Sequence, residues 1–300
     1  MRLLNALIAK TLPIAPRSLV KVVARRYIAG ETLQEAMATV ARLNSEGALG
    51  TVDVLGEFVK NRDVALHETQ RAIEVLEAIR DNGVKSGLSV KLTSLGLDIE
   101  PAFCRENLRK ILARAQQLGI FVRIDMENSP YTDETIAIAR EMREEFGDGV
   151  GIVLQAYLRR TLDDIHSLAA TGMSFRLCKG IYIESEDIAY KGREEVQQNY
   201  MRCLEAILDH GCYVGIATHD EVLVDGARKV IRERDLTSQN YEFQMLLGVR
   251  DQQRLALIAE GHKMRVYVPF GEDWYGYSIR RLKENPAIAG HVFKAIFTGN

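Results

Sequence analysis

Eight short runs of β-forming residues recur along this chain and are separated by segments with helical periodicity. Successive runs start roughly thirty residues apart on average, which is the length of one strand followed by one helix. Several runs are almost continuously apolar, as is typical of strands that helices cover. The runs begin at Thr51, Leu88, Phe121, Gly151, Ser174, Tyr213, Tyr241 and Met264.

Eight alternating β and α units predict an α/β fold, a closed (βα)8 barrel of the TIM type. An open doubly wound sheet is the alternative, but no GxGxxG motif follows the first run. Within this frame, residues 68–83 show helical periodicity and close on a glycine. We predict two parts: an N-terminal helical arm over residues 1–48, and a barrel catalytic domain over residues 49–300.

The composition is that of an ordinary globular protein, with 47% hydrophobic and 27% charged residues in 300. A formal net charge of −2 provides no general attraction to nucleic acid. No apolar run approaches the roughly 18–20 residues that span a bilayer. The four cysteines are scattered without a CxxC pair, which argues against a zinc site and a disulfide framework and favours a reducing, cytoplasmic compartment.

The N-terminal arm is basic. Residues 1–30 carry six Lys or Arg side chains, and no acidic residue precedes Glu31. A short apolar stripe near Leu3 is soon interrupted by Pro13 and Pro16. One interpretation is a helical arm packed on the barrel. The other is a basic amphipathic segment that places the protein at the inner face of the cell membrane.

In a (βα)8 barrel the chemistry belongs at the carboxyl ends of the strands. Polar side chains lie at or near the ends of nearly all eight runs, which indicates a ligand site rather than a purely structural interior. Three of the carboxylates, Glu57, Glu127 and Glu242, have a structural alternative as partners of nearby cations. The full set is Glu57, Lys91, Asp125, Glu127, Gln155, Tyr157, Arg176, Lys179, Thr218, His219, Glu242, Gln244 and Tyr267.

The cations in this set indicate a strongly anionic ligand, or two ligands, in one cavity. Only His219 lies at a strand end, and no HxH or HExxH spacing occurs, so we expect no metal centre. A rival interpretation is a barrel aldolase that forms a Schiff base on Lys91 or Lys179. A non-catalytic ligand sensor is a third alternative.

The segment after the last run predicts a helix across the barrel mouth. Tyr277, Arg280, Arg281 and Glu284 follow i, i+3, i+4, i+7 spacing and share one helix face. Two guanidinium groups bind a carboxylate with a planar geometry that lysine cannot match. A solvated charged face is the alternative. The position after the eighth strand favours a lid that binds a carboxylate.

Several motifs, in order, resemble the proline dehydrogenase family, and most closely its monofunctional bacterial form. They are IDMEN from Ile124, LQAYLRR from Leu154, RLCKGIY from Arg176, ATHD from Ala217, YEFQMLLG from Tyr241 and VYVPFGEDWYGYSIRRLKEN from Val266. The resemblance runs from about residue 91 to 285. It implies a (βα)8 barrel and FAD-dependent oxidation of L-proline to Δ1-pyrroline-5-carboxylate, the first step of proline catabolism to glutamate. A methylenetetrahydrofolate reductase shares such a fold and cofactor, but the Arg-Arg helix argues for an amino-acid substrate.

Carried over position by position, the resemblance implies three groups of residues. The catalytic residues are Asp125 and Arg176. The proline-binding residues are Lys91, Tyr267, Tyr277, Arg280, Arg281 and Glu284. The residues that contact non-covalent FAD are Met126, Gln155, Arg176, Lys179, Gly180, Ile181, Thr218 and His219. The chain departs from the family pattern at Cys178, Ile181, Asp220 and Phe270, which bears on substrate preference rather than on the reaction.

These roles are chemically consistent. Arg280 and Arg281 would fix the carboxylate and orient the substrate for hydride transfer to flavin N5. Arg176 or Lys179 would stabilise the negative charge that the reduced flavin acquires. We interpret Asp125 as a salt-bridge partner of these cations, with action as a base as the alternative. The resemblance implies a membrane quinone as electron acceptor. Oligomeric state, proline against hydroxyproline, and whether Glu284 contacts ligand or holds the arginines stay open.

Overall fold

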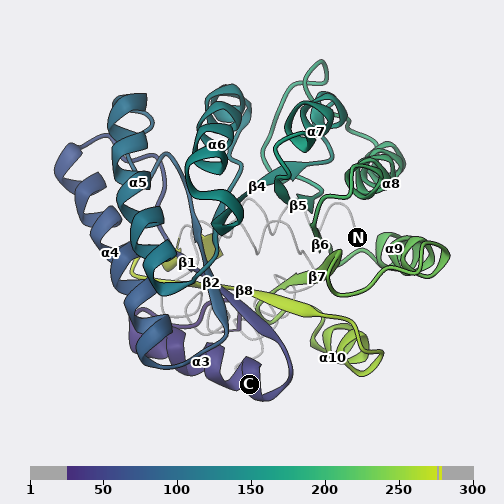
Figure 1. The fold of residues 1–300 in the computed structure, drawn as a ribbon, viewed down its shortest axis with the longest axis horizontal. Helices are drawn as coiled ribbons and strands as arrows, with labels where there is room; N and C mark the ends of the chain where they lie inside the picture. The colour runs from purple at the N-terminus through teal and green to yellow at the C-terminus, as the bar shows by residue number, and fades with distance from the viewer. Residues whose placement is uncertain (1–25, 276, 279–300) are drawn as a thin grey trace, which may run out of the picture.

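The computed structural model describes residues 26–275, 277 and 278 of the chain. Its strands are all parallel and form a closed barrel in sequence order, with β1 paired to β8, so the predicted (βα)8 fold is confirmed (Figure 1). The strands are β1 Leu49–Val54, β2 Ser86–Val90, β3 Val122–Ile124, β4 Val150–Gln155, β5 Ser174–Cys178, β6 Val214–Ala217, β7 Tyr241–Leu246 and β8 Met264–Phe270.

Helices surround the barrel, and one helix follows each of β1 to β7 within the described residues (Figure 1). An additional helix, α3, precedes β1. The helices are α3 Leu33–Ser45, α4 Arg62–Asp81, α5 Pro101–Leu118, α6 Thr132–Phe146, α7 Thr161–Ala169, α8 Arg193–Asp209, α9 Glu221–Glu233 and α10 Asp251–Ala259, with short 3-10 turns η2 Ser129–Tyr131 and η3 Gly147–Gly149.

The hydrophobic core lies between the strands and the helices. Strand residues such as Leu88 and Phe175 are fully buried in one cluster with helix residues such as Leu76 and Ile111. Successive strand residues point to opposite faces, so this apolar layer uses one face of each strand. The other face, which lines the barrel interior, is therefore available to polar side chains.

Two element boundaries differ from the prediction. Strand β1 ends at Val54, so Glu57 lies in the following loop rather than at the strand end. Helix α4 begins at Arg62, six positions before the expected start at Glu68. Asn61 explains the earlier start, because its side chain accepts hydrogen bonds from the backbone N–H groups of Asp63 and Val64 and so caps the helix.

Helix α3 packs against β1 and β8 at the seam where the barrel closes. Just before it, the backbone of Ala29 donates to Pro269 at the end of β8, and Gly271 donates to Gly30. Residues 1–25, which include most of the predicted basic arm, lie outside the described residues. The division of the chain at residue 48 stays a prediction. Among the described helices, none combines the length and apolarity needed to cross a bilayer.

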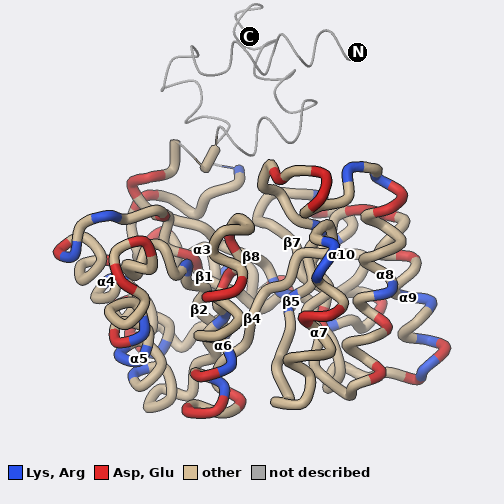
Figure 2. Tube along the Cα trace, turned by 90° about the horizontal axis from the view of Figure 1, so that it is seen from above, with Lys and Arg blue, Asp and Glu red and all other residues tan. Residues whose placement is uncertain are grey.

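The outer surface carries charges of both signs in close succession. Lys and Arg alternate with Asp and Glu along outer helices such as α5 and α6 (Figure 2). Arg105, for example, pairs with Glu134 at 2.7 Å and with Glu141 at 2.8 Å.

Candidate active site

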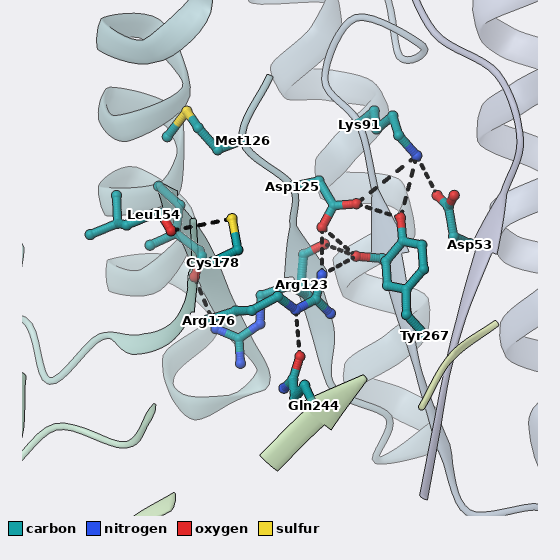
Figure 3. Close-up of polar contacts among 12 residues, drawn as sticks. Asp53, Lys91, Arg123, Asp125, Met126, Leu154, Arg176, Cys178, Gln244 and Tyr267 are labelled. Carbon is teal, nitrogen blue, oxygen red and sulfur yellow. Dashed lines mark hydrogen bonds and ion pairs between the residues drawn. The ribbon is translucent and has the colours of Figure 1, made fainter. Parts of the chain in front are cut away.

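The barrel interior is polar where the strands approach their carboxyl ends. In most barrels of this kind branched aliphatic side chains fill the interior. Here the strand residues that meet there carry carboxylate, hydroxyl, guanidinium and amide groups (Figure 3). They are Asp53 on β1, Ser89 on β2, Arg176 on β5, Gln244 on β7 and Tyr267 on β8, joined by Lys91 and Asp125, which directly follow β2 and β3.

Asp125 is the centre of this network. Its Oδ1 accepts hydrogen bonds from Arg176 Nη1 at 2.8 Å and from Ser89 Oγ at 2.7 Å. Its Oδ2 accepts one from the Tyr267 hydroxyl at 2.7 Å. The expected salt bridge between Asp125 and a strand-5 cation is therefore present. A carboxylate held by three donors from different strands orients its partners, and this favours the anchoring interpretation over action as a base.

Lys91 is held by a residue that the sequence analysis missed. Its Nζ donates to Asp53 Oδ1 at 2.6 Å and lies 4.0 Å from Asp125 Oδ2 and 3.5 Å from the Tyr267 hydroxyl. Asp53 is the single charged residue of β1 and is almost completely buried. A charged residue within a largely apolar run was the sequence signal that could have identified Asp53 as a site residue. It was passed over because the first run was expected to extend to Glu57.

The electrostatics of Lys91 argue against a Schiff base on this lysine, one of the two considered in the aldolase alternative. Burial alone would lower the pKa of Lys91, but the carboxylates of Asp53 and Asp125 outweigh it and hold the pKa above its ordinary value. A Schiff-base lysine needs a neutral, nucleophilic amine near pH 7. Lys91 is instead a fixed ammonium group, suited to binding an anion or holding a carboxylate.

Arg176 is fixed from two sides. Its Nη1 pairs with Asp125, and its Nε donates to Gln244 Oε1 at 2.7 Å. The Gln244 amide is oriented in turn, because its Nε2 donates to Glu242 at 2.7 Å. The guanidinium carbon of Arg176 lies 5.2 Å from the centre of the Tyr267 ring, which adds a cation–π contact. Rotation of this guanidinium would break contacts to three strands.

Glycine makes room for this arrangement in the neighbouring strand. A Cβ on Gly215 of β6 would collide with the side-chain amide of Gln244. A glycine inside a strand weakens it and often marks a close approach of another group. At this position it provides the space in which Gln244 reaches Arg176.

Two of the predicted cofactor residues meet beside the network. Gln155, the last residue of β4, donates from Nε2 to the backbone oxygens of Met126 at 3.1 Å and Glu127 at 3.4 Å. Its Oε1 is buried and accepts no hydrogen bond within the described residues. A buried amide oxygen without a donor is costly, so this atom marks a place for a ligand with an N–H or O–H group.

The predicted cofactor residues Thr218 and His219 directly follow the end of β6. The Thr218 hydroxyl accepts from the backbone N–H of Asp220 at 3.1 Å. His219 Nε2 accepts from the Leu246 N–H at 2.9 Å, which makes this nitrogen the unprotonated one. Both contacts fix the side chains against the β6 and β7 loops.

Lys179, after β5, is partnered by Asp220, one of the positions that depart from the family pattern. The Lys179 ammonium group lies 3.1 Å from Asp220 Oδ2. Burial alone would raise the pKa of Asp220, but hydrogen bonds from Gln197 and Lys179 lower it below its usual value. Gly180 follows with φ +106°, and a Cβ there would collide with the Tyr157 ring. Ile181 is largely exposed.

The three carboxylates suspected of structural roles behave differently. Glu242 is held by Arg265 at 2.6 Å, so its structural role as the partner of a cation is confirmed. Glu127 instead accepts from the hydroxyl of Thr93 at 2.5 Å and from its backbone N–H at 3.0 Å. Burial raises the pKa of Glu127 to about 7. Glu57 lies in the loop after β1.

The lid helix is described only at its start. Tyr277 is buried with Tyr27, Ile28 and Leu55, and Trp274 packs against the same cluster. This cluster, which we call the entry cluster, joins the start of the final helix to the segment before α3 and to the residue after β1. Arg280, Arg281 and Glu284 lie outside the described residues, so their placement over the barrel stays a prediction.

Comparison with known proteins agrees with this geometry. A family profile described as proline dehydrogenase matches residues 36–294. Proline dehydrogenase 2 of Bacillus subtilis is 41% identical over 276 residues, which cover 92% of this chain and 91% of that protein. The proline dehydrogenase of Deinococcus radiodurans is 36% identical over 280 residues, which cover 92% of this chain and 90% of that protein.

A solved structure has the same barrel. The crystal structure of proline utilization A from Bdellovibrio bacteriovorus inactivated by N-propargylglycine superposes with a TM-score of 0.83 and 26% identity over 88% of this chain. The chain spans about a third of that longer protein, 33% of its length.

Proposed function

The chain belongs to the proline dehydrogenase family, and on that premise we propose that it oxidises L-proline to Δ1-pyrroline-5-carboxylate with non-covalently bound FAD as hydride acceptor. The enzyme is an oxidoreductase that acts on proline. The observation that carries the finer proposal is the Asp125–Arg176 ion pair, which holds a guanidinium group, 8% exposed, in the barrel interior. A cation in that position suits a cofactor that gains negative charge during the reaction.

The residues fit a flavin. The buried Gln155 Oε1 lacks a donor among the described residues, and the flavin ring carries an N–H group that meets this need. Met126, beside it, is buried and apolar, as a flat aromatic ligand requires. FAD, when bound, supplies the acceptor for the hydride from proline.

We assign the remaining cofactor contacts to the β5 and β6 loops. Lys179 and Gly180, with Thr218 and His219, would hold the pyrophosphate in place of a glycine fingerprint. Ile181 completes this set, since its exposed side chain is available to cover a ligand. Arg176 would stabilise the negative charge of the reduced ring.

Proline enters this site as a zwitterion, so the site must bind a carboxylate and accommodate loss of a proton from nitrogen. We assign carboxylate binding to Arg280 and Arg281, with further substrate contacts from Lys91 and Tyr267. Tyr277 and Glu284 complete the proposed substrate set. The network around Asp125 keeps Lys91 and Tyr267 in fixed positions before substrate arrives, which is the preorganisation that hydride transfer depends on.

A visible spectrum tests the cofactor. The purified protein should show flavin absorption near ~450 nm, and proline should bleach it under anaerobic conditions. A protein that stays colourless after FAD is added would refute the flavin proposal.

The carboxylate clamp is tested separately by Arg281→Met. We expect KM for proline to rise at least about tenfold while FAD content stays unchanged, because the lost contact is made to substrate. Arg114→Met, on the outer surface of α5, is the matched control. An unchanged KM in Arg281→Met would contradict the clamp.

We further propose that a membrane quinone accepts the electrons and that the basic segment over residues 1–30 brings the protein to an anionic membrane. Six cations and no acid before Glu31 support this proposal. Co-sedimentation with anionic liposomes should be weaker for a chain that starts near Gly30 than for the full chain. Equal binding by both would argue against a role for the arm.

A further inference from the structure

A second cavity lies at the opposite, N-terminal end of the barrel. It has a volume of about 340 Å³, and its walls come from the first residues of several strands and from positions just before them. Chemistry in such barrels belongs to the other end, and the N-terminal face ordinarily contributes stability. Arg176 and Gln244 are shared between this cavity and the active-site network, but the other cations of the cavity have no role in the reaction proposed above.

The walls of this cavity are predominantly cationic. Among the described lining residues, five cations face two carboxylates. The carboxylates are already engaged, since Asp148 binds Arg143 at the surface and Glu242 binds Arg265. The cations are Arg123, Arg143, Arg176, Lys263 and Arg265.

Arg123 is the cation without a counter-ion. Its side chain is buried, and its hydrogen bonds go to neutral groups: Ser174 O at 2.5 Å, Ser174 Oγ at 3.0 Å and Ile152 O at 3.1 Å. No carboxylate of the described residues pairs with it. Burial and the nearby charge of Arg176 lower the pKa of Arg123 to about 9, which still leaves it protonated at neutral pH. The Phe121 ring, whose centre lies 4.7 Å from the guanidinium carbon, adds a cation–π contact. A buried charge without an ion-pair partner is nevertheless expensive.

The fold makes space for this cation. Gly151 is the second residue of β4, where a Cβ would come within 2.5 Å of Arg123 Nη1 and of Ser174 O. Glycine inside a strand costs stability relative to alanine. The barrel therefore accommodates the Arg123 guanidinium at a specific buried position, at the cost of a glycine in β4.

A buried acceptor on the same wall indicates what kind of anion fits. Glu242 Oε2 is buried and accepts no hydrogen bond among the described residues, and the Lys263 ammonium group is 3.8 Å away. An anion bound here must satisfy the cations with its oxygens and also present a donor to this carboxylate oxygen. Hydrogen phosphate and singly protonated phosphate monoesters have anionic oxygens for the cations and an O–H donor for the carboxylate. Sulfate at neutral pH has no proton to donate.

We propose that this cavity binds a phosphate-type oxyanion, free phosphate or a phosphate monoester, between Arg123, Lys263 and Arg265. The Glu242 oxygen that accepts no hydrogen bond within the described part of the chain discriminates against sulfate, because a fully ionised ligand would leave two anionic oxygens in contact. The volume exceeds that of one phosphate ion, so the ester group of a monoester also fits.

Chemical footprinting of Lys263 tests the site. Lys263 is 34% exposed and Lys229, on the outer helix α9, is 69% exposed, so both react with an amine acylating reagent. On the flavin-loaded full-length protein, at matched ionic strength, phosphate should slow acylation of Lys263 about threefold or more and leave Lys229 unchanged. Glycerol phosphate distinguishes a monoester from free phosphate. No protection by either, or equal protection by sulfate, would overturn the proposal.

A binding variant provides an independent readout. Phosphate should raise the Tm of the flavin-loaded protein relative to sulfate, and Lys263→Gln should lose most of this rise. Lys229→Gln, with the same change in charge outside the cavity, should keep it. A rise that is identical in both variants would place the phosphate elsewhere and contradict the site.

Discussion

At the scale of single residues, the active site solves a problem of buried charge. Lys91 and Arg176 are cations in the barrel interior, and Asp53 and Asp125 are the carboxylates that meet them. Removing such groups from water costs several kcal/mol each, which ion pairs offset only when the geometry is good. The pairs come from four different strands or strand ends. Each charge is therefore held by a group from another strand or strand end, and the site is rigid before any ligand binds.

Gln244 is the residue that we expect to position Arg176. Gln244→Met keeps the volume but leaves the Arg176 Nε–H without an acceptor, at a cost of about 1.5–3 kcal/mol. If the transition state depends on that orientation, kcat should fall roughly 10- to 100-fold while KM for proline changes little. Stopped-flow reduction of the flavin by proline measures this step.

The conservative comparison is Gln117→Met on the exposed face of α5, which should leave kcat unchanged. A shift of the flavin absorption maximum in Gln244→Met would support an effect through Arg176 on the cofactor. A kcat within twofold of the original would show that Gln244 only fills space.

At the scale of elements, the loops of the barrel mouth are tied together by a buried carboxyl group. Glu127, after β3, binds Thr93 in the loop after β2. Thr93 in turn accepts hydrogen bonds from Phe58 N–H at 2.9 Å through its hydroxyl and from Val59 N–H at 3.1 Å through its backbone oxygen. Phe58 has φ 57°, a conformation unfavourable for a phenylalanine, which these contacts help to retain. Three βα loops thus depend on one carboxyl group.

This carboxyl group should make stability depend on pH. The folded-state pKa of Glu127 is raised to about 7 by burial, so between about pH 4.5 and 7 the folded state binds more protons than the unfolded state. The free energy of unfolding should therefore fall as pH rises through this window. Across it, the contribution of Glu127 is on the order of 2–3 kcal/mol. Urea unfolding at pH 5 and pH 7.5 measures the difference.

Glu127→Gln removes the titration and keeps a group that hydrogen-bonds Thr93. The pH dependence across this window should become flatter in Glu127→Gln and stay as it was in Glu106→Gln, an exposed position on α5. Parallel pH profiles for all three proteins would contradict a raised pKa at Glu127.

At the scale of the whole molecule, the apolar interior is divided. One large cluster joins the barrel wall to the surrounding helices. Within the part of the chain that the structure describes, the entry cluster of Tyr27, Ile28, Leu55 and Tyr277 is separate from it and much smaller. Small clusters with few contacts open at lower free energy than the core of a domain. The start of the lid helix is therefore anchored more weakly than the barrel that it is predicted to cover.

Trp274 reports on this difference, because it is the single tryptophan of the chain and packs against the entry cluster. Its fluorescence should change at a lower urea concentration than the far-UV circular dichroism of the barrel. Leu55→Ala, which weakens the entry cluster, should move the fluorescence transition further down than the circular dichroism transition. Coincident transitions in both proteins would show that the lid and the barrel unfold as one unit.

The barrel could be predicted from the sequence alone, because strand and helix periodicities are local and repeat eight times. It also identified Lys91, Asp125 and Arg176, since polar residues at the ends of apolar runs stand out without knowledge of their neighbours. Which of these residues pair with one another was harder to predict from the sequence. That Asp125 binds a strand-5 cation followed from charge alone.

The partners Asp53, Ser89 and Gln244 were decided by the tertiary structure. Which residues meet inside a closed barrel depends on the register and stagger of all its strands, and local periodicity does not encode either quantity. The same holds for the cavity at the N-terminal end of the barrel. The role of Arg123 there depends on the groups that surround it, and these come from other strands. The charged residues could be picked out from the sequence because their chemistry is local. Which of them pair, and that Arg123 has no ion-pair partner among the described residues, depends on how the barrel closes.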